Sequence, residues 1–160
     1  MSFDSATKGS LNQTWSTPQD VFDELNQEFH FTLDVCASDH NAKCDRYFTE
    51  ETDGLAQDWH KNICFMNPPF GNMGAWLRKA YEASQSGATV VCLIKVDTST
   101  KWWHDWATKA SEVRFWKKRI KFVPPPNSGL KPGSPNFGVA TLIYRPEIKR
   151  ENYSRMVITV

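Results

Sequence analysis

The stretch ICFMNPPFGNMGAWLRKAYEASQSGATVVCLIKV, residues 63–96, decides the fold of this chain. It starts with a short apolar run, residues 63–66, and ends with a longer one, residues 89–96. The apolar side chains between the runs recur at helical spacing at Trp76, Leu77, Ala80 and Tyr81. This spacing predicts a helix over residues 73–86, which Gly87 would end. Strand, helix and strand in this order are typical of an α/β domain with a parallel sheet.

The rest of the chain adds elements of the same two kinds. A helix is predicted over residues 18–28, where Thr17 would be the N-cap and Pro18 the first helical residue. The other expected elements are strands over residues 31–36, 46–49, 113–116 and 139–144 and a short helix over residues 101–110. We expect a mainly parallel sheet that ends in an antiparallel pair of C-terminal strands.

Length and composition predict one domain. The chain has 160 residues, of which 40% are hydrophobic, and this is enough apolar material for a single core over residues 14–160. Residues 1–13 are polar and are expected to be flexible. Neither a signal peptide nor a membrane-spanning run is visible, so we expect a soluble, cytoplasmic protein without a membrane partner. Residues 122–137, with three consecutive prolines, form the one long loop and are the expected substrate-recognition segment.

The cysteines favour reduced thiols over a metal site. The chain has four cysteines and no CxxC pair. An alternative is a zinc site, because Cys36, His40 and Cys44 could combine with His60 or Cys64 as ligands. The short ligand spacing of structural zinc sites is missing, and we therefore expect no metal.

The net charge of +1 conceals an acidic first part and a basic second part. Residues 1–94 carry 6 Lys/Arg against 13 Asp/Glu, a net charge of −7, whereas residues 95–160 carry 13 against 5, a net charge of +8. Clustered cations suit a polyanion such as a nucleic acid, although a solvated basic surface without a partner would have the same composition. The candidate nucleic-acid contacts are Lys101, Lys117, Lys118, Arg119, Lys121 and Lys131.

The four residues Asn67-Pro68-Pro69-Phe70 follow the first apolar run and carry a chemical pattern. A planar amine, such as that of adenine, is a poor nucleophile because its lone pair is delocalised into the ring. The side-chain carbonyl of Asn67 and the backbone carbonyl of Pro68 could accept the amino hydrogens and stabilise the positive charge that grows on the nitrogen. The two prolines fix this turn, and Phe70 offers a stacking face for an extruded base.

The position of this turn favours a functional role. A purely structural alternative is a Pro-Pro turn whose asparagine caps the backbone and whose phenylalanine packs in the core. In open α/β sheets, however, ligands bind beyond the carboxyl ends of the strands, where residues 67–70 and residues 34–38 would both lie.

Several ordered segments make the sequence resemble the phage-type DNA N6-adenine methyltransferases, a small Dam-like family of phages and prophages. The resemblance runs from about Trp15 to Arg145. It is carried by the segments 15–18, 33–38, 53–55 with Trp59, 67–71, 97–104 and 119–122. A set of matches in this order is more specific than a single tetrapeptide.

The resemblance implies a Rossmann-like methyltransferase fold that binds S-adenosylmethionine at its strand ends and methylates adenine in double-stranded DNA without a metal. The catalytic residues would be Asn67, Pro68, Pro69 and Phe70. The implied cofactor contacts are Trp15, Thr17, Pro18, Asp34, Cys36, Ala37, Ser38, Asp53 and Asp58. Two features depart from the expected pattern. The glycine-rich first motif of larger methyltransferases is replaced by residues 36–38, and Lys95 and Asp97 stand where relatives tend to carry proline and arginine.

Other functions stay open at this point. The same turn could polarise an RNA adenine or a protein glutamine, and the fold could survive as an inactive nucleic-acid-binding module. The small recognition region makes a homodimer an option. The target sequence in DNA is not readable from the chain, because it depends on which side chains reach the base edges.

Overall fold

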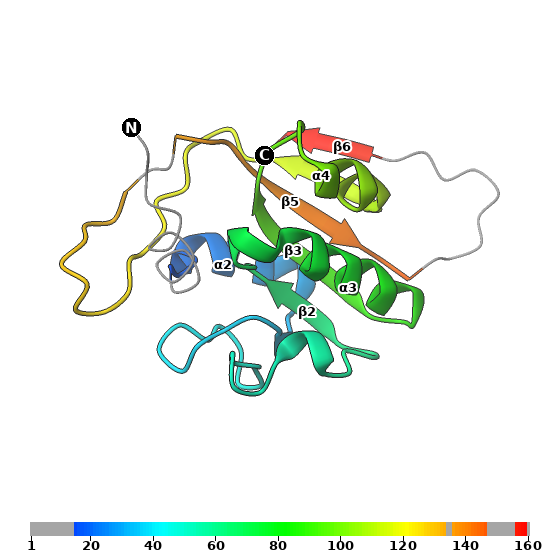
Figure 1. The fold of residues 1–160 in the computed structure, drawn as a ribbon, viewed down its shortest axis with the longest axis horizontal. Coiled ribbons are helices and arrows are strands. Elements are labelled where there is room, and N and C mark those ends of the chain that lie inside the picture. The colour runs from blue at the N-terminus through cyan, green and yellow to red at the C-terminus, as the bar shows by residue number, and fades with distance from the viewer. Residues whose placement is uncertain (1–14, 134–135, 147–155, 160) are drawn as a thin grey trace.

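The computed structural model describes residues 15–133, 136–146 and 156–159, and a six-stranded sheet forms its centre. The strands are β1 (Leu33–Asp34), β2 (Ile63–Met66), β3 (Thr89–Lys95), β4 (Glu112–Phe115), β5 (Val139–Tyr144) and β6 (Met156–Thr159). Their order across the sheet is β1-β2-β3-β5-β4-β6. Every described strand runs in the same direction except β5, which is antiparallel to both of its neighbours (Figure 1).

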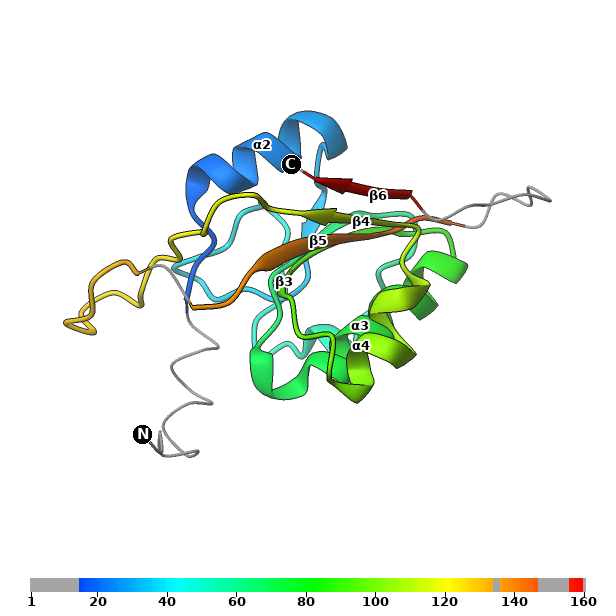
Figure 2. The ribbon, with the colours of Figure 1, turned by 90° about the horizontal axis from the view of Figure 1, so that it is seen from above.

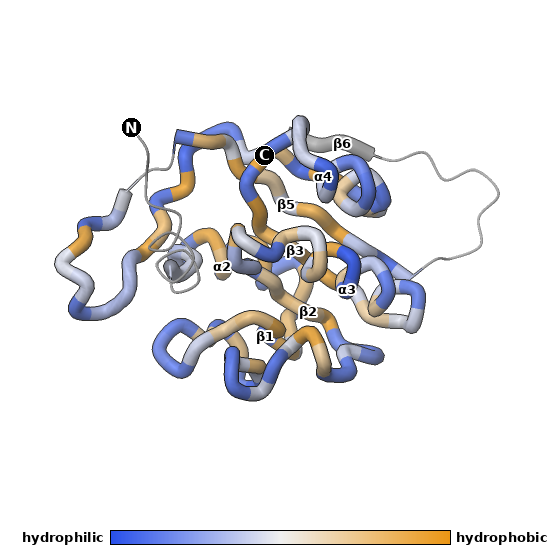
Figure 3. The backbone as a smooth tube through the Cα atoms, in the orientation of Figure 1, coloured by the Kyte–Doolittle hydropathy of each residue, from blue (hydrophilic) through white to orange (hydrophobic). Residues whose placement is uncertain are grey.

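Helices cover both faces of the sheet (Figure 2). On one face lies α2 (Gln19–Phe29), whose buried residues Val21, Phe22 and Leu25 share a core with Phe65 of β2. On the other face lie α3 (Met73–Gln85) and the short α4 (Lys101–Asp105). Because strands covered on both faces need apolar residues at every position, β2, β3 and β5 are hydrophobic along most of their length (Figure 3).

Most of the expected elements are present with small changes in their bounds. The strands at residues 63–66 and 139–144 and the start of α3 agree with the sequence prediction. A 3-10 turn, Phe70–Asn72, precedes α3, and the positive φ of Gly87, 103°, follows its end. In place of the expected strand at 46–49 there is a single bridge, between Tyr47 and Asp34 of the outermost strand β1.

The start of α2 differs from the prediction. Pro18, and not Thr17, is the N-cap residue, because its ψ of 142° is extended and the helix begins at Gln19. The N-cap makes no side-chain hydrogen bond. The hydroxyl of Thr17 is thus free of a capping role.

The C-terminal strands also differ in part from the expected antiparallel pair. β4 and β5 do pair in antiparallel fashion, but β5 lies between β3 and β4. The last strand, β6, was not predicted, and it runs parallel to β4. The expected flexible segment 1–13 lies outside the described residues.

This topology brings one end of every described strand to the same edge of the sheet, and β6 finishes there because Thr159 pairs with Phe115. β1, β2, β3 and β4 finish there, at Asp34, Met66, Lys95 and Phe115. β5 begins at the same edge, because Val139 pairs with Lys95 and Ala140 with Phe115. The residues that follow β1, β2 and β3, and the long connection from β4 to β5, therefore meet at one edge, which we call the carboxyl edge.

Candidate active site at the carboxyl edge

Asn67 follows β2 directly and is oriented by the segment that precedes α2. Its Nδ2 donates a hydrogen bond to the backbone carbonyl of Trp15, over 3.5 Å. No hydrogen bond to Asn67 Oδ1 is found within the described part of the chain. The contact with Trp15 therefore leaves the side-chain carbonyl of Asn67 as an acceptor for a ligand.

Phe70, at the end of the same turn, is half-buried and has two close neighbours. Its ring meets that of Phe137 edge-on, with the centroids 5.4 Å apart and the planes at 87°. Lys95 Nζ lies 5.7 Å from the centroid of the Phe70 ring and 3.5 Å from a carboxylate oxygen of Asp97. Phe70 thus packs both against the core beneath α3 and against a residue of the β4–β5 connection.

A pocket of about 410 Å³ lies beside this turn. Pro69 and Asn72 form one wall, and the loop after β1 forms another through Cys36, Ala37 and Ser38. The pocket is also lined by four acidic residues: Asp39, Glu50, Glu51 and Asp53. Its size suits a small-molecule ligand, and its acidic lining suits one with positive charge.

Gly54 holds the acidic turn close to β1. A Cβ atom at this position would lie 2.1 Å from the backbone oxygen of Val35 and 3.2 Å from the Trp76 ring. Only glycine permits this approach, which places Asp53 at the rim of the pocket. Trp59 secures the same turn, because its Nε1 donates to the carbonyl of Gly54 over 2.8 Å.

Asp34 lies at the end of β1 and is only 2% exposed. Its carboxylate accepts hydrogen bonds from the backbone N–H groups of Lys43, over 3.0 Å, and Cys36, over 3.3 Å. Burial disfavours the charged form more strongly than these bonds favour it, and it raises the pKa of Asp34 to about 6. Asp34 therefore fixes the loop after β1 and carries a buried charge at neutral pH.

A small cavity connects Asp34 with Asn67. It is lined by both of these residues together with Trp15 and Thr17, and Cys36 borders both this cavity and the larger pocket. The Thr17 hydroxyl is buried and has no hydrogen-bond partner in the described part of the protein. Buried hydroxyl groups are nearly always satisfied, so this atom indicates the place of a polar ligand group or a water.

Two of the predicted cofactor contacts lie elsewhere. Pro18 is the N-cap of α2 and lines neither the pocket nor the small cavity. Asp58 is also outside both linings, and its carboxylate accepts from the backbone N–H of His60 over 2.8 Å. Asp58 thus stabilises a turn. The remaining predicted contacts, Trp15, Thr17, Asp34, Cys36, Ala37, Ser38 and Asp53, all border one cavity or the other.

The predicted nucleic-acid contacts are exposed. Lys117, Lys118, Arg119, Lys121 and Lys131 all lie on the β4–β5 connection. None of them forms a salt bridge with another described residue. Lys101 differs, because it starts α4 and pairs with Asp105 one turn later.

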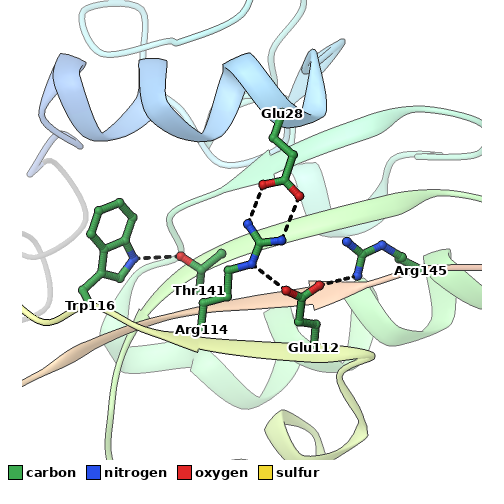
Figure 4. Close-up of polar contacts among 6 residues, drawn as sticks. All are labelled: Glu28, Glu112, Arg114, Trp116, Thr141 and Arg145. Carbon is green, nitrogen blue, oxygen red and sulfur yellow. Dashed lines mark hydrogen bonds and ion pairs between the residues drawn. The ribbon is translucent and has the colours of Figure 1, made fainter. Parts of the chain in front are cut away.

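Arg114 belongs to the same run of cations in the sequence but has a structural role (Figure 4). It bonds both carboxylate oxygens of Glu28, over 2.5 and 2.8 Å, and its Nε bonds Glu112 over 2.6 Å. Arg145 pairs with the other oxygen of Glu112, over 2.8 Å. The network ties α2 to β4 and to the end of β5, so Arg114 is not free to neutralise a phosphate.

The alternative zinc site does not form. No group of three or more potential metal-ligating side chains is found in residues 15–133, 136–146 and 156–159. Burial raises the pKa values of Cys36, Cys44 and Cys64 to about 12, which keeps these thiols protonated. Over the same residues, no helix has the length and hydrophobicity needed to cross a membrane.

Several residues that line the site were not predicted from the sequence. Phe48, Leu55, Asn72 and Trp76 line the larger pocket, but their sequence pattern fits an ordinary core equally well. The pairing of Phe137 with Phe70 joins residues 67 positions apart, and no local signal reports it. The acidic turn at residues 50–53 did carry a signal, because Glu50 and Glu51 lie three and two positions before the predicted contact Asp53.

Comparison with known proteins identifies the family. The model of the family described as DNA N-6-adenine-methyltransferase (Dam) matches residues 4–160. A DNA N-6-adenine-methyltransferase of Haemophilus phage HP1 (strain HP1c1) is 38% identical over 123 residues, which are 74% of this chain and 71% of the relative. A protein with the same description from Escherichia phage T1 is 29% identical over 109 residues, 67% of this chain and 46% of the relative. With these matches and the site at its carboxyl edge, the chain belongs to the DNA N-6-adenine-methyltransferase (Dam) family.

Proposed function

We propose that this chain transfers a methyl group from S-adenosylmethionine to the exocyclic N6 amino group of an adenine extruded from double-stranded DNA. Membership of the Dam family supports the reaction and the class of substrate. The observation that carries the assignment of the chemistry is the orientation of Asn67, whose Nδ2 is held by Trp15 while Oδ1 is left to accept. As a DNA methyltransferase, the protein is expected to act in the cytoplasm. That the chain forms a homodimer also remains a prediction.

The larger pocket suits S-adenosylmethionine as the bound methyl donor. The molecule carries a net positive charge, which the four acidic residues around the pocket would favour. Asp53 is positioned to accept from ribose hydroxyls, and the small side chains of residues 36–38 permit close approach. Thr17 and Asp34 would hold the amino-acid portion, which would satisfy the unpaired Thr17 hydroxyl. The sheet order and this pocket together support a Rossmann-like methyltransferase fold.

The turn after β2 would activate the amino group. S-adenosylmethionine supplies an electrophilic methyl group, whose bond to sulfur breaks as its bond to N6 forms. Asn67 Oδ1 and the Pro68 carbonyl accept the two N6 hydrogens, which localises the lone pair of the nitrogen and stabilises its developing positive charge. Phe70 stacks on the adenine ring, and N6 later releases one proton to solvent.

Label transfer to different acceptors tests this proposal. The purified chain would be given S-adenosylmethionine with a tritiated methyl group, together with duplex DNA, RNA or a protein mixture, and the products would be digested and separated. We expect the label in N6-methyladenine from duplex DNA. Label found only in RNA, or only in protein glutamine, would identify that group as the methyl acceptor instead. Absence of S-adenosylmethionine binding in calorimetry would assign a nucleic-acid-binding module.

A further inference from the structure

The β4–β5 connection contains a closed, projecting segment. Phe122 and Gly133 form an antiparallel bridge, and we call residues 122–133 the arm. Phe122 is buried with Trp116 and Ile120 in the core beneath α2, so the base of the arm is anchored. Beyond this point the arm extends away from the body of the protein in both views, where it is coloured yellow to orange (Figures 1 and 2).

Both ends of the connection are joined to the catalytic turn. At one end, Val123 exchanges two backbone hydrogen bonds with Ser16, over 2.7 and 2.9 Å. The neighbouring Trp15 carbonyl is the one that accepts from Asn67. At the other end, Phe137 packs edge-on against Phe70. These contacts place the base of the arm close to the turn that would receive the adenine.

The tip of the arm is a defined turn. Three consecutive prolines, residues 124–126, fix three φ angles ahead of it. The Ser128 N–H then donates to the Pro125 carbonyl over 3.3 Å, and the Leu130 N–H donates to the Ser128 hydroxyl over 3.2 Å. Gly129 has a φ of 70°, and a Cβ atom placed there would have no neighbour within 4 Å. The tip thus presents the exposed Leu130 next to a turn that two hydrogen bonds define.

The surface of the arm combines apolar and positive groups. Leu130 is 45% exposed and Val123 is 41% exposed, and these are the exposed large hydrophobic residues of the described chain. Lys121 and Lys131 flank them and are exposed as well. Residues 113–146 contain seven Lys/Arg and no Asp or Glu. A single exposed leucine is ordinary on a protein surface. Next to a defined turn and within a segment that has basic but no acidic residues, however, it fits a partner that combines negative charge with stacked bases.

We propose that Leu130 is a wedge that enters the base stack of the DNA at the step left open by the extruded adenine. Apolar side chains that enter a base step unstack it, and the flanking lysines would hold the phosphates on either side. Extrusion costs unstacking free energy, and a wedge that fills the gap offsets part of this cost. The proposal rests on the proposed function, because it needs a duplex substrate whose target base is taken out of the stack.

The test compares two duplexes that carry the methylated site mapped by sequencing DNA from cells that express the chain. In one duplex the target adenine is paired with thymine, and in the other it faces an abasic site, so extrusion needs little help. Leu130→Ala should methylate the paired duplex about tenfold more slowly than wild type in single turnovers, and the abasic duplex at the wild-type rate. Leu130→Met should keep most of the rate on both duplexes.

A second measurement and a control separate the wedge from other roles. With 2-aminopurine at the target position, wild type should raise the fluorescence and Leu130→Ala should raise it much less. Lys131→Ala, a matched change at the next position, should weaken binding of both duplexes equally. Equal rates of wild type and Leu130→Ala on the paired duplex, or an equal loss on both duplexes, would overturn the wedge. If wild type methylates neither duplex, the proposed function fails as well, independently of Leu130.

Discussion

The larger pocket and the β4–β5 connection meet at the same edge of the sheet but differ in how their charged groups are held. Beside the pocket, Asp34 is buried and accepts from two backbone N–H groups, and the close approach of Gly54 to β1 fixes the backbone of the turn that carries the exposed Asp53. On the connection, the cations from Lys117 to Lys131 are exposed and lack ion-pair partners in the described chain.

This difference follows from what each region has to do. A methyl transfer requires groups that are fixed before the substrate arrives, and burial supplies that fixation. Binding to a polyanion requires charges that can exchange counterions for phosphates, and exposure supplies that freedom. The turn at residues 67–70 joins the two regions, because Asn67 contacts Trp15 beside the small cavity and Phe70 contacts Phe137 on the connection.

The largest expected effect is the loss of chemistry on changing the shared turn. Asn67→Ala removes the acceptor of an N6 hydrogen, and we expect the single-turnover rate of methyl transfer to fall about 1,000-fold. The dissociation constants for S-adenosylmethionine and duplex DNA should change less than about threefold. A variant with near wild-type turnover would remove Asn67 from the mechanism.

The next effect concerns stability and not binding. Glu112→Ala would leave Arg114 and Arg145 beside each other without their shared carboxylate, and removal of one partner from a buried network costs about 3 kcal/mol in the free energy of unfolding. Urea denaturation followed by circular dichroism measures this change. DNA affinity per folded molecule should stay the same. If DNA affinity fell and stability did not, the network would belong to the DNA-binding region.

Asp34 gives a smaller effect whose size depends on pH. Asp34→Asn should weaken S-adenosylmethionine binding about tenfold at pH 8, where the wild-type carboxylate is charged, and the difference should shrink at pH 5, below the pKa of about 6. Calorimetric titration at both pH values measures this difference. A difference in affinity that is independent of pH would assign Asp34 a purely steric role.

The same raised pKa has a consequence for folding. A carboxyl group whose folded pKa lies above its unfolded value binds more protons in the folded state, so its stabilising contribution is lost as the pH rises through about 6. Without cofactor, Asp34→Asn should therefore gain stability relative to wild type between pH 5 and pH 8. Thermal denaturation across this range tests the sign.

An effect of similar size, on DNA binding and not on cofactor binding, is expected from the exposed cations. Lys118→Ala combined with Arg119→Ala should weaken duplex binding about tenfold at moderate salt and lower the slope of log affinity against log salt by about 2. Fluorescence anisotropy with a labelled duplex provides both values. Arg78→Ala on the exposed face of α3 is the matched control and should leave the slope unchanged. An unaltered slope in the double variant would place the DNA elsewhere.

Local patterns in the sequence were enough to predict the central strands and the position of the turn at residues 67–70 after β2. The apolar runs at residues 63–66 and 89–96 and the helical spacing between them fix β2, α3 and β3, and strand order then brings Asp34 and Asn67 to one edge. The family resemblance and this position together suggested the roles of individual residues, namely catalysis for Asn67 and Phe70 and cofactor binding for Asp34. These roles remain proposals.

Features that depend on long-range contacts could not be predicted. The insertion of β5 between β3 and β4 is a matter of strand pairing across more than 40 residues, and no local pattern encodes it. In the sequence, Arg114 is one more cation in a basic run. Its structural role depends on its contact with Glu28, which is 86 positions away. Asp58 lies in a local turn, where its carboxylate accepts from the His60 N–H, and it lines neither cavity; its contact with the cofactor stays a prediction.

The separation of the two regions is tested most directly by one crossed titration. S-adenosylmethionine and duplex DNA would each be titrated into Asp34→Asn and into the Lys118→Ala/Arg119→Ala variant at pH 8. We predict that Asp34→Asn loses about tenfold in cofactor affinity and keeps its DNA affinity, whereas the double variant shows the reverse. Two folded variants that each lose affinity for both ligands to the same extent would contradict this prediction.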